Sequence, residues 1–305
     1  MDVSIIIVNY NTKNLLADCL NSIYEQTKDI SFEVIVSDNG SKDGSIEMLK
    51  ADFPQVILIE NNANLGFGAA NNRGLAIAKG KYILYLNSDT ILLNNAVKCF
   101  FDYWEENGEK ENIGALGTNL LNRNNEIIHS YGSFMKYGIE LKNSLKALRA
   151  TSIYTILSIF SKRFPPLDIQ DDRTQKYVGD VDYITGADLF LKNDDLALFD
   201  EHYFMYCEET DLQLKMAKAE KKRILIDKPQ IIHLSGGGNK KLSDKVRSLA
   251  SFSSINFNIS RIYYFKKNGS SNFKTNFLRI ITLLTWLNPL ILRVTRKYIP
   301  TLLKI

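Results

Sequence analysis

The first 112 residues of the chain alternate between short apolar runs and segments whose apolar residues recur at helical spacing. The apolar runs are rich in Val and Ile, which is typical of strands buried on both faces of a sheet. The predicted strands cover residues 3–8, 32–36, 56–60 and 82–86. The predicted helices are one capped by Thr12, then 45–50, 66–79 and 94–106. Repeated strand–helix units of this length predict an α/β fold with a mostly parallel sheet and helices on both faces.

The pattern changes after Ile113. Shorter candidate strands lie at 114–118, 126–131, 181–192 and 223–227, with a helix that begins near Glu209. This arrangement predicts a mixed rather than a parallel second half. Between these strands, residues 136–163 are basic and carry an apolar patch at 153–160, followed by Pro165-Pro166. Two interpretations stay open for this segment: a mobile insertion near the site, or a helical hairpin on the surface.

The composition is that of an ordinary globular protein, with 45% hydrophobic and 24% charged residues, which excludes collagen-like and disordered chains. The three cysteines lie far apart and form no Cys-x-x-Cys pair. We therefore expect neither a disulfide framework nor a zinc or thiol redox site, consistent with a reducing cytoplasm. The N-terminus lacks the basic segment and long apolar run of a signal peptide, so no secretion signal is expected.

The net charge of +4 is unevenly distributed, because no acid follows Asp244 whereas 11 Lys and Arg do. This basic end predicts a polyanionic partner. Its longest uncharged run, 280–292, has 13 residues, fewer than the roughly 20 that span a bilayer. We therefore expect the run to lie on an anionic membrane surface; a C-terminal helix packed on the rest of the protein is the alternative. Nucleic acid is not expected, because aliphatic residues rather than a stacking platform separate the cations.

Polar residues follow two of the predicted strands, at the sheet edge where ligands bind in folds of this class. Asn87-Ser88-Asp89 comes directly after residues 82–86, and a carboxylate there can hold a divalent cation that bridges a diphosphate. A turn or a helix cap is the alternative. Asp38 and Asn39 follow residues 32–36 and could contact a ribose or a base edge, unless they form only an Asx-rich turn.

The segment 61–74 combines three Asn residues before a predicted helix with glycines inside it. Gly66 permits close backbone approach to a ligand, and Arg73 could steady a phosphate. The segment is not a dinucleotide-binding fingerprint, because Asn71 stands where the third glycine would be.

Two further groups suggest acid–base or metal chemistry. Glu208 and Glu209, with Asp211, open a predicted helix; closely packed carboxylates raise the proton affinity of one of them, which suits a general base. Ordinary stabilisation of a helix N-terminus is the alternative. His233 precedes a glycine run and is a candidate for a metal or phosphate contact, against a purely structural role.

In this order and spacing, these segments resemble the family 2 glycosyltransferases, which have the nucleotide-diphospho-sugar GT-A fold. The likeness runs from about Val3 to Gly238 and rests first on the strand VSIIIVNYN and the helix signature NLGFGAANNRG. Asn87-Ser88-Asp89 occupies the DxD position and Glu208-Glu209-x-Asp211 the base motif. Thr185-Gly186-Ala187 looks like the strand that lines the sugar pocket, and Phe199-Asp200-Glu201 like the acceptor-side loop.

The resemblance implies a role for each matched residue. The catalytic base is expected at Glu209, with Glu208 as the alternative. A divalent cation, Mg or Mn, is expected on Asp89 and His233, because Asn87 replaces the first acid of DxD. The implied donor-nucleotide contacts are Asn9, Asp38, Asn39, Asn64, Gly66, Asn72, Arg73 and Ser88. The implied sugar or acceptor contacts are Gly186, Ala187, Asp188 and Asp211, although Asp188 could equally pair with a buried arginine.

The resemblance also implies the reaction: inverting transfer of a sugar from a nucleotide-diphospho-sugar to a hydroxyl of a lipid-linked saccharide, in cell-surface polysaccharide synthesis, with rhamnose as the preferred sugar. The alternatives are a non-catalytic nucleotide-sugar binding module and a nucleotidyltransferase on a related fold. The expected domains are a catalytic domain at 1–244 and a basic amphipathic tail at 245–305. The catalytic domain divides into a nucleotide-binding half, 1–112, and an acceptor-binding half, 113–244, with an insertion at about 136–176. We expect a cytoplasmic protein, peripheral on the inner face of the cell membrane.

Overall fold

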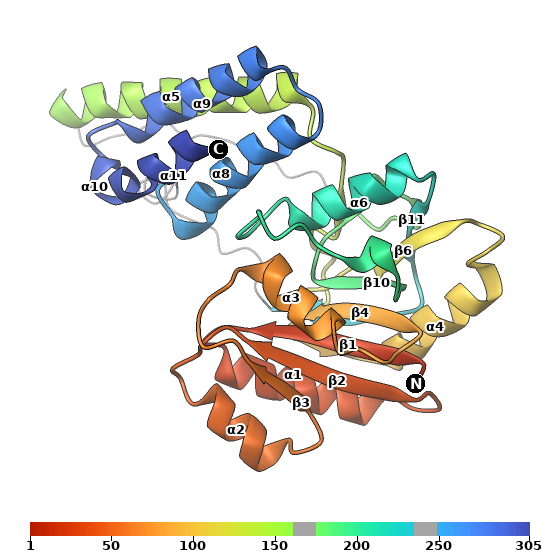
Figure 1. Ribbon diagram of the computed structural model, residues 1–305. Helices are drawn as coiled ribbons and strands as arrows, with labels where there is room; N and C mark the ends of the chain where they lie inside the picture. Colours follow the sequence, from red (N-terminus) through yellow and green to blue (C-terminus); the bar gives the residue numbers. More distant parts are fainter. Residues whose placement is uncertain (161–174, 235–248) are drawn as a thin grey trace. The chain divides into compact units, whose positions relative to one another are not determined.

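The computed structural model describes residues 1–160, 175–234 and 249–305, which form two compact units (Figure 1). The sheet unit comprises Met1–Phe134, Asp171–Phe204 and Glu208–Gly236. The helical unit comprises Met135–Gln170, Met205–Cys207 and Gly237–Ile305. Part of the predicted insertion at 136–176 and the predicted boundary at 244 lie outside the described residues.

The sheet unit is built on an eight-stranded sheet in the order β3-β2-β1-β4-β10-β6-β11-β8. Its strands are β1 (Val3–Asn9), β2 (Phe32–Asp38), β3 (Ile57–Glu60), β4 (Tyr82–Asn87), β6 (Ile113–Thr118), β8 (Gly179–Asp180), β10 (Asp188–Lys192) and β11 (Lys222–Ile226). The first four strands are parallel, whereas β10 runs antiparallel to both β4 and β6. The predicted parallel first half and mixed second half are therefore confirmed.

Helices cover both faces of this sheet (Figure 1). They are α1 (Lys13–Gln26), α2 (Ser45–Asp52), α3 (Phe67–Leu75), α4 (Ala96–Asn107) and α6 (Glu208–Lys218), with a 3-10 turn at Asp195–Ala197. Successive strand residues point to opposite faces. Ile5 and Ile7 accordingly pack with α1, α2 and α4, whereas Ile6 packs with α3 and α6. Strands β1, β2 and β4 are largely buried on both sides, as their sequence predicts, whereas β3 at the edge of the sheet is only partly buried.

Two predicted strands differ from the structure. Residues 126–131 form only a bridge at Ile127 and the two-residue strand β7 (Tyr131–Gly132). The Asn122 side chain accepts from the backbone amides of residues 124 and 126, which makes the preceding stretch a turn. The predicted strand 181–192 is divided into β9 (Tyr183–Ile184) and β10, because residues 185–187 turn to pair with other partners. A separate pair, β5 (Thr90–Leu92) and β12 (Ile231–His233), is antiparallel.

Two helix predictions also need correction. Helix α3 ends at Leu75, four residues before the predicted end, because the chain tightens there: Ile77 N donates to Gly74 O, and Ala78 N to Leu75 O. Thr12 occupies the N-cap position of α1, but its side chain makes no capping hydrogen bond. Its hydroxyl donates instead to Asn9 Oδ1 at 2.6 Å, at the end of β1.

The helical unit contains α5 (Tyr137–Phe160), α8 (Phe252–Lys267), α9 (Asn272–Trp286), α10 (Leu292–Thr295) and α11 (Ile299–Lys304), with a 3-10 turn at Arg296–Tyr298. Residues 137–160, for which a mobile insertion and a hairpin were both open, form one continuous helix. The unit has a core of its own, which includes Ile262, Leu278 and Trp286. No helix among the described residues is long and apolar enough to cross a membrane.

A close backbone contact fixes the start of α3. Gly66 has φ +91°, and the amide of Phe67 donates to the Phe204 carbonyl oxygen at 3.0 Å. A Cβ atom at Gly66 would lie 2.2 Å from that oxygen. Only glycine satisfies both the left-handed φ and the close approach.

We therefore predict that Gly66→Ala lowers the free energy of unfolding by about 1–3 kcal/mol, because the backbone must shift or adopt a strained φ. Gly186→Ala is the matched control in the same unit, since its Cβ would meet Phe67 at an ordinary 3.5 Å. Urea unfolding followed by circular dichroism measures both. Equal losses in the two variants would contradict this view of Gly66.

Candidate active site

The carboxyl ends of β1, β2 and β4 lie together at one edge of the sheet. Asn9 is paired in register with Asp38, and Val8 with Asn87. Because parallel strands end at the same edge, the polar residues that terminate them become neighbours. The structure thus assembles three of the predicted site segments from distant parts of the sequence.

Asp38 organises the loop after β2. It is fully buried, and its Oδ2 accepts from Asn9 Nδ2 at 2.6 Å. Its Oδ1 accepts from the backbone amides of Gly40, at 3.0 Å, and Ser41, at 2.8 Å. Hydrogen bonds to a charged acceptor are among the stronger ones in proteins. Asp38 therefore holds this loop in one shape at the edge of the sheet.

A network of amide side chains joins that loop to the start of α3. Asn39 Nδ2 donates to Gly66 O at 3.1 Å and to Asn64 Oδ1 at 3.3 Å. Asn64 Oδ1 also accepts from the Gly66 amide at 3.0 Å. Asn61, which was not among the predicted contacts, donates to Asn39 Oδ1 at 3.1 Å. The predicted donor contacts Asn39, Asn64 and Gly66 are thus brought together.

Ser88 joins the same network through Thr12, whose side chain was expected to cap a helix. Its Oγ is 2.9 Å from Thr12 Oγ1, and the Thr12 hydroxyl contacts Asn9. The hydroxyls thereby connect the end of β4 to the end of β1.

Asn72 and Arg73 lie apart from this network. The Asn72 amide donates to Phe199 O at 2.9 Å and to Glu201 Oε1 at 3.0 Å, and its Oδ1 accepts from Phe199 N. Asn72 thus holds the predicted acceptor-side loop, 199–201. Arg73, next to it on α3, is exposed to solvent.

Asp89 and His233 meet where β5 pairs with β12. His233 Nε2 lies 3.2 Å from Asp89 Oδ1 and 3.3 Å from Asn87 Nδ2. Two ligands about 2.1 Å from an octahedral cation are about 3 Å apart, so the Asp89–His233 separation suits a shared ion. In the described part of the chain no group of three or more His, Cys, Asp or Glu could hold a metal. The pair can supply two ligands, and Mg²⁺ commonly takes the rest from phosphates and water.

Glu209 faces the Thr185-Gly186-Ala187 turn. A Cβ at Gly186 would lie 3.6 Å from Glu209 Cβ. Helix α6 is held against β9 by the buried Gln213, whose Oε1 accepts from Ile184 N at 2.8 Å and whose Nε2 donates to Ile184 O at 2.7 Å. Sequence reasoning missed Gln213, although it stands one helical turn after Glu209.

The carboxylates of α6 differ in accessibility. Glu208 is 4% and Asp211 6% exposed, whereas Glu209 is partly exposed. Burial nevertheless raises the pKa of Glu209 above its usual 4.5, because removal from water disfavours the charged form. A partly exposed carboxyl with raised proton affinity is suited to taking a proton from a bound hydroxyl.

The backbone before these carboxylates is strained. Tyr206 and Cys207 both have φ 68°. A non-glycine residue in this left-handed region costs roughly 1–2 kcal/mol. Neither residue type signals such a conformation, so no sequence pattern could have revealed it.

Asp188 is fully buried at the start of β10. Its Oδ2 accepts from Thr118 N at 2.7 Å, and Oδ1 has no hydrogen-bond partner among the described residues. It shares a strand face with Phe190, which packs on the side of α4, whereas α6 lies on the other side. No arginine pairs with it in the described ranges. Burial raises its pKa well above the usual 3.8.

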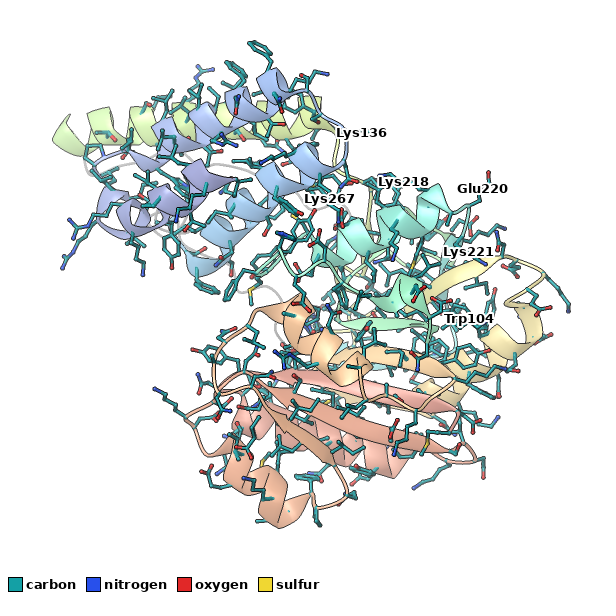
Figure 2. All side chains as sticks on the ribbon, viewed as in Figure 1. Trp104, Lys136, Lys218, Glu220, Lys221 and Lys267 are labelled. Carbon is teal, nitrogen blue, oxygen red and sulfur yellow. The ribbon has the colours of Figure 1, made fainter. Side chains whose placement is uncertain are left out.

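A cavity of about 270 Å³ lies at the opposite edge of the sheet. Trp104 and Lys221 (Figure 2) line it together with Ile113, where β6 begins, and Lys192, where β10 ends. None of the predicted site residues lines this cavity.

Comparison with known proteins identifies related sequences. A model of the family described as glycosyl transferase family 2 matches residues 4–156. The poly(ribitol-phosphate) beta-glucosyltransferase of Bacillus spizizenii is 35% identical over 121 residues, which are 38% of this chain and 19% of that protein. Escherichia coli WfaP, named UDP-Glc:alpha-D-GlcNAc-diphosphoundecaprenol beta-1,3-glucosyltransferase, is 32% identical over 180 residues, which are 55% of this chain and 66% of WfaP. The matched part spans less than two thirds of either relative.

Two solved structures share the fold. The mannosyltransferase PcManGT of Pyrobaculum calidifontis, in complex with GDP-Man and Mn2+, has a TM-score of 0.54 at 15% identity, covering 99% of this chain and 73% of that one. S. aureus TarS 1-349, in complex with UDP-GlcNAc, has a TM-score of 0.54 at 15% identity, covering 100% and 79%. At this identity the likeness shows the fold alone, which is the GT-A fold that the motifs implied.

The buried carboxyl of Asp188 makes stability depend on pH. Between 3.8 and its raised pKa the folded state binds more protons than the unfolded state, so this group's contribution to the free energy of unfolding falls by about 1.4 kcal/mol per pH unit as pH rises. We predict that Asp188→Asn removes this fall, so that the variant gains on the wild type as pH increases. Urea unfolding at several pH values measures the difference; parallel curves would contradict the prediction.

Proposed function

The chain belongs to glycosyl transferase family 2, and we propose that it is an inverting glycosyltransferase that uses a nucleotide-diphospho-sugar. One observation carries the proposal: the turn 185–187 lies between a candidate base and a candidate cation pair. Glu209 faces Gly186 on one side. On the other side, the Ala187 carbonyl oxygen accepts from the Asn87 amide at 3.0 Å, and the Asn87 side chain contacts His233. This arrangement suits a donor sugar held between the acceptor hydroxyl and its own diphosphate.

In the proposed reaction, Glu209 takes the proton from the acceptor hydroxyl. The oxygen then attacks the anomeric carbon in line, and the nucleoside diphosphate leaves. A single displacement inverts the configuration. The greater exposure of Glu209 favours it over Glu208, which is buried beside it.

We propose that Asp89 and His233 hold a divalent cation, Mg or Mn, together with the diphosphate. The cation would stabilise negative charge that develops on the leaving group. The separation of the two side chains and the mixed oxygen and nitrogen ligands fit such an ion. The Mn2+ in the complex of PcManGT supports the same expectation.

For the donor nucleotide, we propose contacts from the network at the sheet edge, which comprises Asn9, Asp38, Asn39, Asn64, Gly66 and Ser88. Asn72 is then a positioning residue for the acceptor-side loop, because its amide contacts residues 199 and 201. Arg73 stays a candidate phosphate contact from solvent. Gly186, Ala187 and Asp211 border the proposed sugar and acceptor region, and the buried Asp188 supports it from behind.

The acceptor is proposed to be a lipid-linked saccharide of a cell-surface polymer, met on the inner face of the membrane. The names of the Bacillus and Escherichia relatives, which act on poly(ribitol-phosphate) and on a diphosphoundecaprenol-linked sugar, support this class. Both relatives are glucosyltransferases, so a glucosyl donor competes with the rhamnosyl donor favoured from sequence.

Two other functions are less well supported. A nucleotidyltransferase would need a Gly-rich phosphate loop with Lys or Arg after the first strand, and Tyr10-Asn11-Thr12 stands there. A non-catalytic binding module would leave Glu209 without a role. Slow hydrolysis of a nucleotide sugar by the purified protein would exclude the non-catalytic binding module.

We predict that Glu209→Gln lowers the rate of transfer by about two to four orders of magnitude, because it removes a general base while keeping the shape of the side chain. Donor binding, measured by calorimetry, should change little. Glu208→Gln is the matched control and should retain most activity. The reverse result would assign the base to Glu208.

The raised pKa of Glu209 predicts the pH dependence of the same reaction. The base must be ionised, so kcat/KM should fall as pH drops through a value above the usual 4.5 of a glutamic acid. This fall in kcat/KM at low pH should be absent from the residual activity of Glu209→Gln. If the same fall persists in this variant, the pH dependence arises from another ionisable group.

We predict that Asp89→Ala and His233→Ala weaken nucleoside-diphosphate binding only when Mn²⁺ or Mg²⁺ is present. His202→Ala is the control, because His202 is exposed and pairs with Asp200 instead. Calorimetric titration with and without a chelator separates cation-dependent binding of the nucleoside diphosphate from cation-independent binding. Wild-type binding and activity that a chelator leaves unchanged would contradict the role of the cation.

A further inference from the structure

Helix α9 presents an apolar stripe to solvent. The stripe consists of Phe273, Phe277, Ile280, Leu284 and Leu287, which follow one another at intervals of four and three residues. This spacing places them along one side of the helix. Their exposed fractions range from 37% to 79%, and the rings of the two phenylalanines stack with centroids 6.3 Å apart.

The opposite side of α9 is already packed inside the helical unit. Leu278, Ile281, Thr285 and Trp286 are buried there, and α9 packs against α5 and α8. A surface helix normally turns polar residues outward. Because α9 is apolar on both sides, its own core does not explain the outward stripe.

The helical unit that carries the stripe is strongly basic. The described parts of the helical unit contain thirteen Lys and Arg and a single acid, Glu140. Glu140 is neutralised by Arg261, whose Nη1 lies 2.9 Å from its Oε2. The cations come from α5 as well as from the C-terminal helices; Lys136 and Lys267 lie where α5 begins and α8 ends (Figure 2).

We propose that this stripe is the surface by which the helical unit lies on an anionic bilayer. Apolar side chains would enter the boundary between headgroups and acyl chains while exposed cations of the unit meet lipid phosphates. This surface is where the protein would meet the membrane that carries the proposed acceptor. The biological role of the contact rests on the proposed function, but the contact itself does not.

Two other arrangements fit the stripe less well. With 15 residues, α9 is about 22 Å long, shorter than the roughly 30 Å of hydrocarbon that a spanning helix crosses. A second copy of the chain could cover a stripe of this spacing, but both copies would bring only cations to the flanks. Like charges at these positions oppose pairing.

The test is vesicle binding by the full-length chain. Truncation is unsuitable, because removal of α9 would take Leu278 and Trp286 from the core. The stripe variant is Ile280→Glu with Leu284→Glu. The matched control is Ile77→Glu with Leu198→Glu, which places the same charges at similarly exposed apolar positions in the sheet unit.

With vesicles of equal parts phosphatidylglycerol and phosphatidylcholine, we expect the stripe variant to bind at least about tenfold more weakly than the wild type, and the control to bind almost normally. Vesicles of phosphatidylcholine alone should bind the wild type poorly, and high salt should weaken binding to anionic vesicles only in part. Wild-type binding by the stripe variant would overturn the proposal. So would a lipid-free dimer that the stripe variant dissociates.

A second measurement does not depend on a charged substitution being tolerated. Leu284→Trp should be quenched by brominated lipid in anionic vesicles, whereas Ile77→Trp should not. Equal quenching of the two, or none, would contradict the proposal. Nucleotide binding by each variant, measured separately, shows whether the donor site is intact, so a failure of the proposed transferase activity is not confused with a failure of membrane binding.

Discussion

One backbone hydrogen bond, from the Asn87 amide to the Ala187 carbonyl oxygen, joins the two halves of the candidate site. It continues the antiparallel pairing of β4 with β10 by one step beyond Asp188. The turn 185–187 is thereby held at the carboxyl end of β4. Glu209 then faces the turn from α6, while Asp89 and His233 meet beside Asn87. Without this pairing, neither the proposed base nor the cation pair would have a fixed position relative to the other.

Charge follows the compact units rather than the order of the chain. No acid follows position 244 in the sequence, and the basic segment that contains α5 belongs to the same helical unit. Helix α5 adds three cations, Lys142, Lys146 and Arg149, and Lys136 directly precedes it. In the sheet unit, in contrast, a candidate site carboxylate such as Asp38 is buried and hydrogen-bonded. The proposed donor site and the proposed surface for anionic lipid therefore belong to different compact units.

The strands and the edge where they end could be predicted because each depends on local sequence: Val and Ile runs form β1 and β2, and polar residues follow them. The pairing of Asp89 with His233 was also anticipated, from the resemblance. What could not be predicted depends on partners distant in sequence. The Thr12 hydroxyl donates to Asn9 instead of to the helix that Thr12 begins, and the Asn72 amide is bonded to the loop at residue 199. The division of the segment 181–192 into two strands requires knowing where Asn87 lies.

We propose that the residues at the sheet edge form a cation-assisted site for a nucleoside diphosphate. Thermal-shift measurements with nucleoside diphosphates and nucleotide sugars, each with and without Mn²⁺ or Mg²⁺, test it most directly, since a ligand that binds the native state raises the melting temperature. We expect the melting temperature to rise with nucleotides of at least one base, to rise further when the cation is present, and to lose that further rise in Asp89→Ala. No shift with any nucleotide, in either condition, would contradict it.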